Sequence, residues 1–164
     1  MADVIITLPR GLILAILMGK KSVECRKTFP KIGFRYGRVW FVEKGTSYVR
    51  GYFTIDHVSE HHDYFKLWHE YGREIFVEEK WFNDYAKTAK KALYLWHIAH
   101  VFKCEGNIDV MEYFGVRHNP QSFIYRPLRP YVKTELVRVY NPRTKALERP
   151  SFRKVERKDD DLLF

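Results

Sequence analysis

Three charged side chains that lie close together in this sequence could act on one ligand. Lys21, Glu24 and Arg26 come directly after an apolar stretch, residues 12–18, which ends at Gly19. The apolar stretch predicts a helix that stops at a glycine cap. The residues after it alternate between apolar and polar types, which predicts a strand that carries Glu24 and Arg26 on one face. Ammonium and guanidinium groups bind anions, and a carboxylate beside them accepts hydrogen bonds or protons.

A purely structural role would explain the same residues. Glu24 and Arg26 would then form an ordinary ion pair on the strand. Lys20 and Lys21 would be a solvated helix end, where cations favour the negative end of the helix dipole. Spacing alone leaves both interpretations open.

The pattern Gly19-x-Lys21-x-x-Glu24-x-Arg26 resembles the signature of the ASCH domain family, whose members have a PUA-like fold with a small β-barrel. The order of the expected elements around the pattern is also similar to that family. These elements are strands at residues 4–8, 38–43 and 49–56, the short helix after the first strand, and a closing segment at residues 119–125. The resemblance spans about residues 3–127.

The sequence therefore predicts an α+β protein with a small mixed β-barrel of the PUA-like type, flanked by helices. Helical periodicity on both sides of Gly72 predicts a helical insertion at about residues 63–90, made of segments 63–71 and 77–90. Further strands are expected at residues 92–103 and 134–140.

We expect residues 1–141 to form one domain and residues 142–164 to form a charged, mobile tail. A chain of 164 residues that is 46% hydrophobic is sufficient for one packed core. After Pro142 the sequence has few apolar residues, so ordering that segment would have little burial to offset its entropy cost.

The two cysteines, Cys25 and Cys104, are far apart in the sequence. Cys25 falls on the apolar side of its strand, which favours a buried free thiol in a reducing compartment over a disulfide or a nucleophile. Residues 12–18 are too short to cross a bilayer, and lysines rather than a small-residue cleavage site follow them. We expect a cytoplasmic protein that does not contact a membrane.

The formal net charge of +9 indicates an anionic partner. Basic residues gather in residues 20–38 and 117–157, whereas acidic residues concentrate in residues 56–79 and 159–161. Charge separated in this way attracts a polyanion, and nucleic acid is the commonest one. The alternative is a basic surface that only confers solubility. Phe29 lies in a basic loop, where an exposed ring could stack on a base.

We expect no metal site. The cluster of His57, His61 and His62 with Asp56 and Asp63 does not have the spacing of a zinc site and is expected to be a polar turn before a helix. The sequence contains no phosphate-binding glycine loop, nucleophile elbow or HExxH motif.

The family resemblance implies an RNA-associated protein whose ligand lies in a groove beside Lys21, Glu24 and Arg26. The two cations would meet phosphate or a carbonyl oxygen, and Glu24 would accept hydrogen bonds from an exocyclic amine or hold Arg26. RNA or another nucleic acid is the expected partner, and the oligomeric state is left open. The expected binding residues are Lys20, Lys21, Ser22, Glu24, Arg26, Lys27, Phe29 and Arg35.

The resemblance also implies a second possibility, a small hydrolase in which Lys21 and Glu24 are catalytic. It would be a ribonuclease, or less readily an amidohydrolase acting on an acylated cytidine, because Glu24 stands where that branch has a threonine nucleophile. No cofactor is expected, except a divalent metal if the protein is a nuclease. A third possibility is a protein-interaction adaptor that uses the helical insertion, with Trp68, Trp81 and Tyr85.

Overall fold

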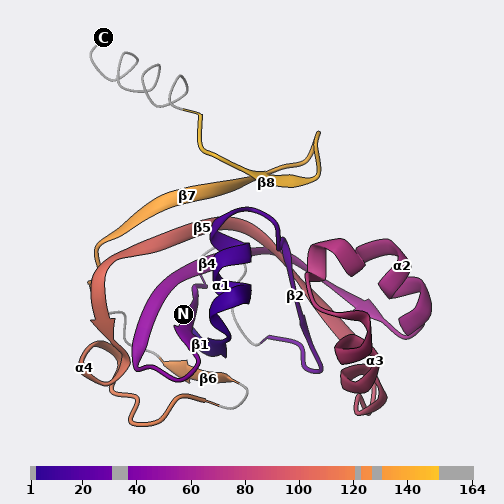
Figure 1. The fold of residues 1–164 in the computed structure, drawn as a ribbon, viewed down its shortest axis with the longest axis horizontal. Helices are drawn as coiled ribbons and strands as arrows, with labels where there is room; N and C mark the ends of the chain where they lie inside the picture. The colour runs from indigo at the N-terminus through magenta and orange to yellow at the C-terminus, as the bar shows by residue number, and fades with distance from the viewer. Residues whose placement is uncertain (1–2, 31–36, 121–122, 127–130, 152–164) are drawn as a thin grey trace.

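The computed structural model describes residues 3–30, 37–120, 123–126 and 131–151, and it combines one sheet with four helices (Figure 1). In chain order the elements are β1 (Asp3–Leu8), α1 (Arg10–Leu17), β2 (Val23–Arg26), β3 (Val39–Glu43), β4 (Tyr48–His61), α2 (Tyr64–Ile75), α3 (Glu79–Lys87), β5 (Leu93–Asp109), α4 (Val110–Phe114), β6 (Phe123–Arg126), β7 (Thr134–Asn141) and β8 (Ala146–Glu148). The α+β class is as expected, and so is the order of the elements from β1 to β4 around the motif.

The strands form a mixed sheet in the order β6-β1-β3-β4-β5-β7-β8, and β2 pairs with β5 beside this path. β1 and β3 are parallel, whereas β4 and β5 are antiparallel over most of their length. The expectation of a closed barrel is wrong, because no pairing joins β6 to β8 in the part of the chain that the structure describes. The edge of β5 is shared by two strands in succession: β2 pairs with Tyr94–His97 and β7 pairs with His100–Cys104.

The sheet and the helices enclose three groups of buried apolar side chains. The first lies between α1 and the sheet and includes Ile6, Ile16, Phe41, Phe53, Trp96 and Leu147. The second lies beside α4 and includes Ile5, Trp40, Val49, Val110 and Phe114. The third joins β2 and β5 to the helical insertion and includes Val23, Cys25, Leu67, Ile75, Phe82 and Leu95. The helical insertion is therefore attached to the sheet by its own core.

The helical insertion between β4 and β5 is confirmed, but its break lies elsewhere than expected. α2 continues through Gly72, where an added Cβ would lie 3.1 Å from the Trp68 ring. The helix ends at Phe76, which has a left-handed backbone with φ of 57°. β4 also extends to His61, because residues 57–61 pair with β5, so His57 and His61 lie on a strand rather than in a polar turn.

The predicted mobile tail, residues 142–164, includes an ordered strand, β8. β8 forms a hairpin with β7, and Leu147 is only 4% exposed because it packs in the core under α1. Three-residue strands carry little pattern, so the alternation that identified β7 did not reveal β8. Residues 152–164 lie outside the described part of the chain, and a tail there stays a prediction.

Both cysteines are free and buried, as expected. In the ranges that the structure describes, no helix has the length and apolar character needed to cross a bilayer.

Gly19 provides a sharp test of how α1 is joined to the rest of the fold. Its φ is +78°, and a side-chain Cβ there would collide with the carbonyl oxygen of Leu147. We expect Gly19→Ala to lower the free energy of unfolding by about 2 kcal/mol or more, because alanine disfavours this backbone conformation and the hairpin must shift. Gly11→Ala is the matched control, since Gly11 lies in α1 with no atom within 4 Å of an added Cβ.

Urea denaturation of both variants measures the difference. Gly11→Ala should change stability by no more than about 1 kcal/mol, in the stabilising direction. Equal stabilities for the two variants would show that the close packing of Gly19 against β8 does not hold in solution.

Candidate functional site

Lys21, Glu24 and Arg26 form a continuous, mostly buried ionic triad. The Lys21 Nζ lies 3.3 Å from Glu24 Oε2, and the Arg26 Nε lies 3.0 Å from Glu24 Oε1. Lys21 is 1% exposed, and its Nζ also donates a hydrogen bond of 2.6 Å to the Ile75 carbonyl oxygen. The triad therefore ties β2 to the C-terminal end of α2.

Local backbone geometry sets the position of each member of the triad. The backbone N–H groups of Lys20 and Lys21 both donate to the Ala15 carbonyl, which caps α1 after Gly19. The next N–H, that of Ser22, donates to the Glu74 carbonyl at 3.1 Å. From Val23 on, the chain pairs with β5, so Glu24 and Arg26 lie on one face and Val23 and Cys25 pack in the third core.

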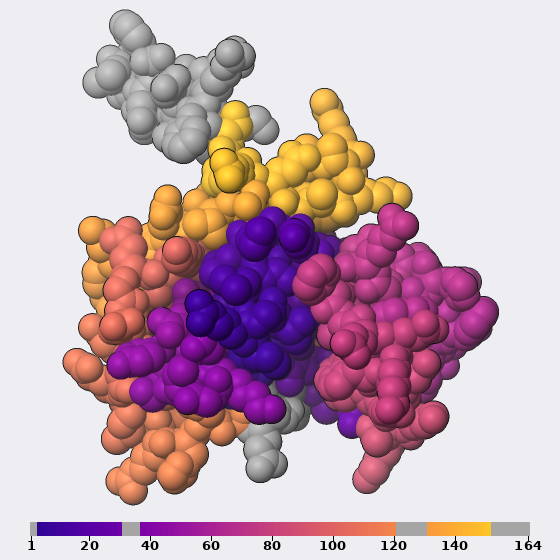
Figure 2. All heavy atoms as spheres, in the orientation of Figure 1, coloured from indigo at the N-terminus to yellow at the C-terminus, as the bar shows by residue number. Residues whose placement is uncertain are grey.

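A cleft of about 790 Å³ opens beside Glu24 and Arg26. One wall comes from the end of β1 and the start of α1, and the opposite wall comes from the α2–α3 connection and α3. Figure 2 shows the helical lobe of α2 and α3 next to the segment that contains α1. The residues that line the cleft include Thr7, Glu24, Arg26, Phe76, Trp81 and Tyr85.

Aromatic rings form much of the helical wall of this cleft. The rings of Trp81 and Tyr85 stack with their centroids 5.0 Å apart, and Trp81 is 51% exposed. The Lys27 Nζ lies 4.4 Å from the centroid of the Tyr85 ring. Phe76 is 42% exposed in its left-handed position between the two helices. A cleft with an aromatic wall and a carboxylate–guanidinium pair can hold a flat, polar ring.

The residues expected at the site do not all meet in this cleft. Glu24 and Arg26 line it, whereas Lys21 lies behind Glu24 and is not among the lining residues. Direct contact between Lys21 and phosphate is therefore not favoured in this conformation. Ser22 lines a separate pocket, and Lys20 is exposed at the end of α1.

Lys27 is not among the residues that line the cleft, but its Nζ lies over the Tyr85 ring. The ring of Phe29 is half exposed and lies edge-on to Tyr94, with centroids 5.8 Å apart. Arg35 lies outside the described residues. Sequence analysis does not identify Phe76 and places Trp81 and Tyr85 on a possible adaptor surface. Helical periodicity identifies residues that share a face, but not the part of the fold that this face contacts.

Two ionisable groups near the triad have strongly raised pKa values. Burial raises the pKa of the Cys25 thiol to about 12, and the Glu24 carboxylate adds to this effect. Burial also raises the pKa of Tyr85 to about 12, against a lowering effect of Arg26. At neutral pH Cys25 is therefore a protonated thiol rather than a nucleophile, and Tyr85 keeps its hydroxyl proton.

A second polar cluster lies around His97, the β5 residue that pairs with Val23 of β2. The rings of His57 and His97 stack with centroids 4.0 Å apart, and the Nδ1 of His57 lies 2.7 Å from Asp56 Oδ2. The Ser59 hydroxyl bridges the Nε2 atoms of His97 and His61 at 2.8 and 2.7 Å. In the part of the chain that the structure describes, no group of three or more histidine, cysteine or acidic side chains is arranged to hold a metal ion.

Two irregularities in the β4–β5 ladder bring this cluster together. The register pairs Thr54 with His100, Ile55 with Ile98 and His57 with His97, so Asp56 and Ala99 are skipped. The strand expected at residues 92–103 is present, but its pairing with β4 is irregular at these two positions. Bulges of this kind redirect side chains and are common beside functional sites.

The chain is similar to known proteins in sequence and in structure. No family model matches the chain. A curated protein of Zymomonas mobilis named ASCH domain-containing ribonuclease is 33% identical over 79 residues, which are 48% of this chain and 52% of that protein. The matched region thus spans about half the length of the curated relative.

The solved structures agree over a larger part of the chain. The crystal structure of ASCH from Zymomonas mobilis has a TM-score of 0.65 at 25% identity and covers 77% of this chain and 87% of its own. A mutant of the same protein gives a TM-score of 0.65 at 24% identity, with 77% and 88% covered.

The fold and the cleft thus define a small α+β protein with an open mixed sheet and a helical insertion. The comparisons support the resemblance to the ASCH domain family, because the curated relative is named for that domain and the solved ASCH structures have a similar fold.

The burial of Lys21 makes its contribution to stability measurable. Lys21→Met removes one cation from a buried triad and leaves the Ile75 carbonyl without its donor. We expect the free energy of unfolding to fall by about 3 kcal/mol, because a buried carboxylate loses compensation. Lys20→Met, at an exposed neighbour, should stay within about 0.5 kcal/mol of the unsubstituted protein. Urea denaturation of the two variants compares them, and equally small effects would contradict a stabilising triad.

The histidine cluster predicts a loss of stability in mild acid. Burial, with the neighbouring His57 and His61, lowers the pKa of His97 from 6.5 to about 4 against the raising effect of Asp56. Between these two values the unfolded chain binds a proton that the folded chain does not. The free energy of unfolding should therefore fall as the pH decreases through this window.

His97→Gln should flatten that pH dependence, whereas His100→Gln, at an exposed histidine on the same strand, should leave it unchanged. Part of the slope should remain in His97→Gln, because burial also lowers the pKa of His61. Denaturation curves at several pH values from neutral down to pH 4 provide the measurement. An identical pH dependence in all three proteins would refute the assignment to His97.

Proposed function

We propose that the protein binds RNA, with one base held in the cleft between Glu24 and Trp81. The observation that carries this proposal is that a stacked aromatic pair and a carboxylate–guanidinium pair open into the same 790 Å³ cleft. Single-stranded RNA is commonly held by base stacking on aromatic rings together with hydrogen bonds to base edges.

Each part of the cleft has a role in this proposal. An exposed face of Trp81 stacks on the base, and Glu24 and Arg26 offer an acceptor and donors to its polar edge. Thr7 also lines the cleft, and its hydroxyl oxygen is buried without a hydrogen-bond partner among the described residues. The formal net charge of +9 supports contact with the phosphates on either side.

RNA cleavage is the second candidate, because the curated relative is named a ribonuclease. In the cleft, Glu24 is the carboxylate closest to the guanidinium of Arg26 and would act as the acid or base on a ribose hydroxyl. Lys21 would act through Glu24 by holding its carboxylate rather than by meeting the substrate. Removal of an acyl group from cytidine is less favoured, because Glu24 cannot supply a nucleophilic hydroxyl. An adaptor role would need Trp81 for a protein partner, which competes with the stacking role proposed here.

Binding of a short, fluorescently labelled single-stranded RNA tests the proposal. Trp81→Ala should weaken binding by about tenfold or more, since a stack on one base contributes about 1–3 kcal/mol. Phe65→Ala is the matched control, because Phe65 is 76% exposed on α2 outside the cleft. Equal affinities for the two variants would remove the cleft from the proposal.

The same samples report cleavage when the RNA is separated on a denaturing gel, with and without Mg²⁺ or Mn²⁺. Cleavage that Glu24→Gln abolishes would support the ribonuclease. Intact RNA that remains bound would support binding alone. RNA that is neither bound nor cut would contradict both candidates.

A further inference from the structure

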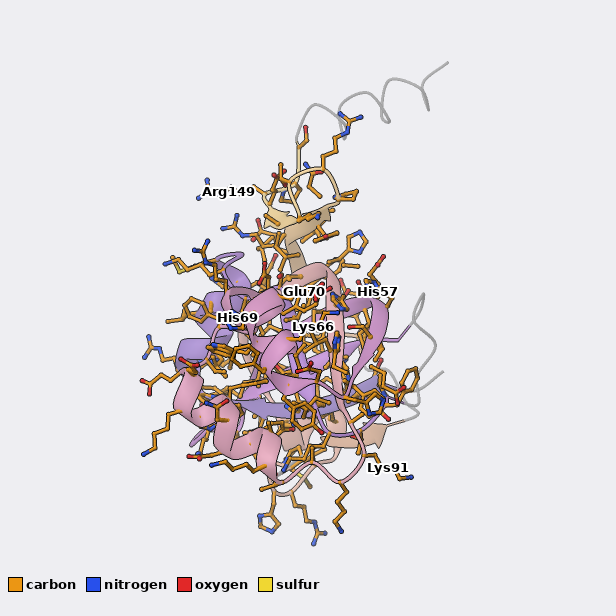
Figure 3. All side chains as sticks on the ribbon, turned by 90° about the vertical axis from the view of Figure 1, so that its right-hand side faces the viewer. His57, Lys66, His69, Glu70, Lys91 and Arg149 are labelled. Carbon is orange, nitrogen blue, oxygen red and sulfur yellow. The ribbon has the colours of Figure 1, made fainter. Side chains whose placement is uncertain are left out.

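A second pocket lies at the start of β2, beside Ser22 and Val23, and has a different chemistry from the cleft beside Glu24 and Arg26. Its volume is about 270 Å³. It lies between the C-terminal half of β4, the N-terminal half of β5, the C-terminal half of α2 and the β7–β8 hairpin. Its lining includes Ser22, Asp56, His57, Glu70, Tyr71, Glu74, His97, Tyr140 and Lys145. His57 and Glu70 lie on the face of the molecule that Figure 3 presents to the viewer.

Carboxylates are the main charged groups of the pocket. Asp56, Glu70 and Glu74 come from two different elements, and all three line the same space. Asp56 uses only its Oδ2 for the hydrogen bond to His57. In addition to burial, Glu70 and Glu74 raise the pKa of Tyr71, so its hydroxyl remains protonated.

The imidazole of His97 does not offset this negative charge. Burial lowers its pKa to about 4, so at neutral pH His97 is uncharged. Lys145 is the lysine at the rim, where it is exposed on the hairpin turn with a left-handed φ of 55°. Negative charge therefore prevails in the pocket at neutral pH.

Ser22 is an independent sign that the pocket receives a polar group. The residue is only 8% exposed, and its side chain lines the pocket. Its hydroxyl makes no hydrogen bond with any residue in the described ranges, although its backbone N–H and C=O are both used. The Ser22 oxygen is not one of the fully enclosed polar atoms without a partner, so it is open to the pocket, where a bound ligand or water can form a hydrogen bond with it.

The walls beside the carboxylates are aromatic. Tyr71 lies edge-on to His97 with centroids 5.5 Å apart, and Tyr140 lines the pocket from β7. Carboxylates with aromatic faces around a small space favour an organic cation over a hydrated inorganic ion. The absence of a suitable metal arrangement among the described residues points the same way.

We propose that the pocket formed by Ser22, Asp56, Glu70, Glu74, Tyr71 and Tyr140 binds the primary ammonium group of an alkylamine. The ammonium has three donors, which the Glu74 carboxylate, the Asp56 carboxylate and the Ser22 hydroxyl accept. The alkyl chain packs on the rings of Tyr71 and Tyr140. Lys145 repels the ligand at the rim. This proposal does not depend on RNA binding in the cleft.

Titration of the full chain with putrescine, followed by isothermal calorimetry near neutral pH at constant ionic strength, tests the proposal. We expect saturable binding at one site, with no binding of 1,4-butanediol, the uncharged match, or of inorganic phosphate. Glu74→Gln should weaken putrescine binding by about tenfold, the loss of one charge-assisted hydrogen bond. Lys145→Ala should strengthen it.

Asp84→Asn is the matched control, because it removes one exposed carboxylate from α3 outside the pocket. Its affinity for putrescine should equal that of the unsubstituted protein. If Glu74→Gln does not fold, as judged by circular dichroism, Ser22→Ala and Asp56→Asn replace it, and each should weaken binding.

A free amine and a lysine side chain of another protein present the same ammonium group. Nα-acetyl-lysine N-methylamide distinguishes the two sources, since tighter binding of this compound than of putrescine would identify a peptide lysine. No saturable binding of either amine at millimolar concentrations would overturn the proposal. Binding of phosphate in their place, or an equal loss in Asp84→Asn, would also overturn it.

Discussion

The buried contact between Lys21 and the end of α2 is the constraint on which the cleft depends. Lys21 donates to the Ile75 carbonyl and pairs with Glu24, so one side chain joins the helical insertion to the signature strand. Ile75 is the last residue of α2, and Phe76 turns the chain toward α3 and Trp81. This buried ammonium thus acts together with the third core to hold the Glu24–Arg26 pair beside the aromatic wall. Lys21 thus supports the cleft without lining it.

The two halves of β5 divide the molecule into separate units of packing. Leu93 and Leu95 pack with the helical insertion, whereas Trp96, Ile98 and Val101 pack under α1. The bulges at Asp56 and Ala99 allow this change, because a regular strand would keep Trp96 and Val101 on opposite faces. They also leave Asp56 beside His57 at the surface of the second pocket. One local irregularity in the ladder therefore serves both the packing and the polar cluster.

The sequence alone predicts the strand and the helix end near the motif, but it does not predict which distant residues contact them. Alternation placed Glu24 and Arg26 on one face and Cys25 on the other, and the glycine cap at Gly19 is present with φ of +78°. These features are local, so residue order determines them. The burial of Lys21 depends on Ile75, more than fifty positions away. Helical periodicity likewise gave the shared face of Trp81 and Tyr85, but only tertiary packing turns that face toward β2.

The open sheet and the short β8 illustrate a second limit of sequence patterns. A barrel and an open sheet use the same alternation, and they differ only in whether the edge strands pair. β8 has three residues, yet Leu147 fills the core under α1 and its carbonyl lies against Gly19. The hairpin at the end of the described chain thus fixes the end of α1, and with it the start of the segment that carries Lys21. The Ser22 N–H donates to the Glu74 carbonyl, and the Lys21 ammonium donates to the carbonyl of the next residue, Ile75, so the cleft and the second pocket share the end of α2 as a support. A ligand that shifts the end of α2 in one of them must move the wall of the other.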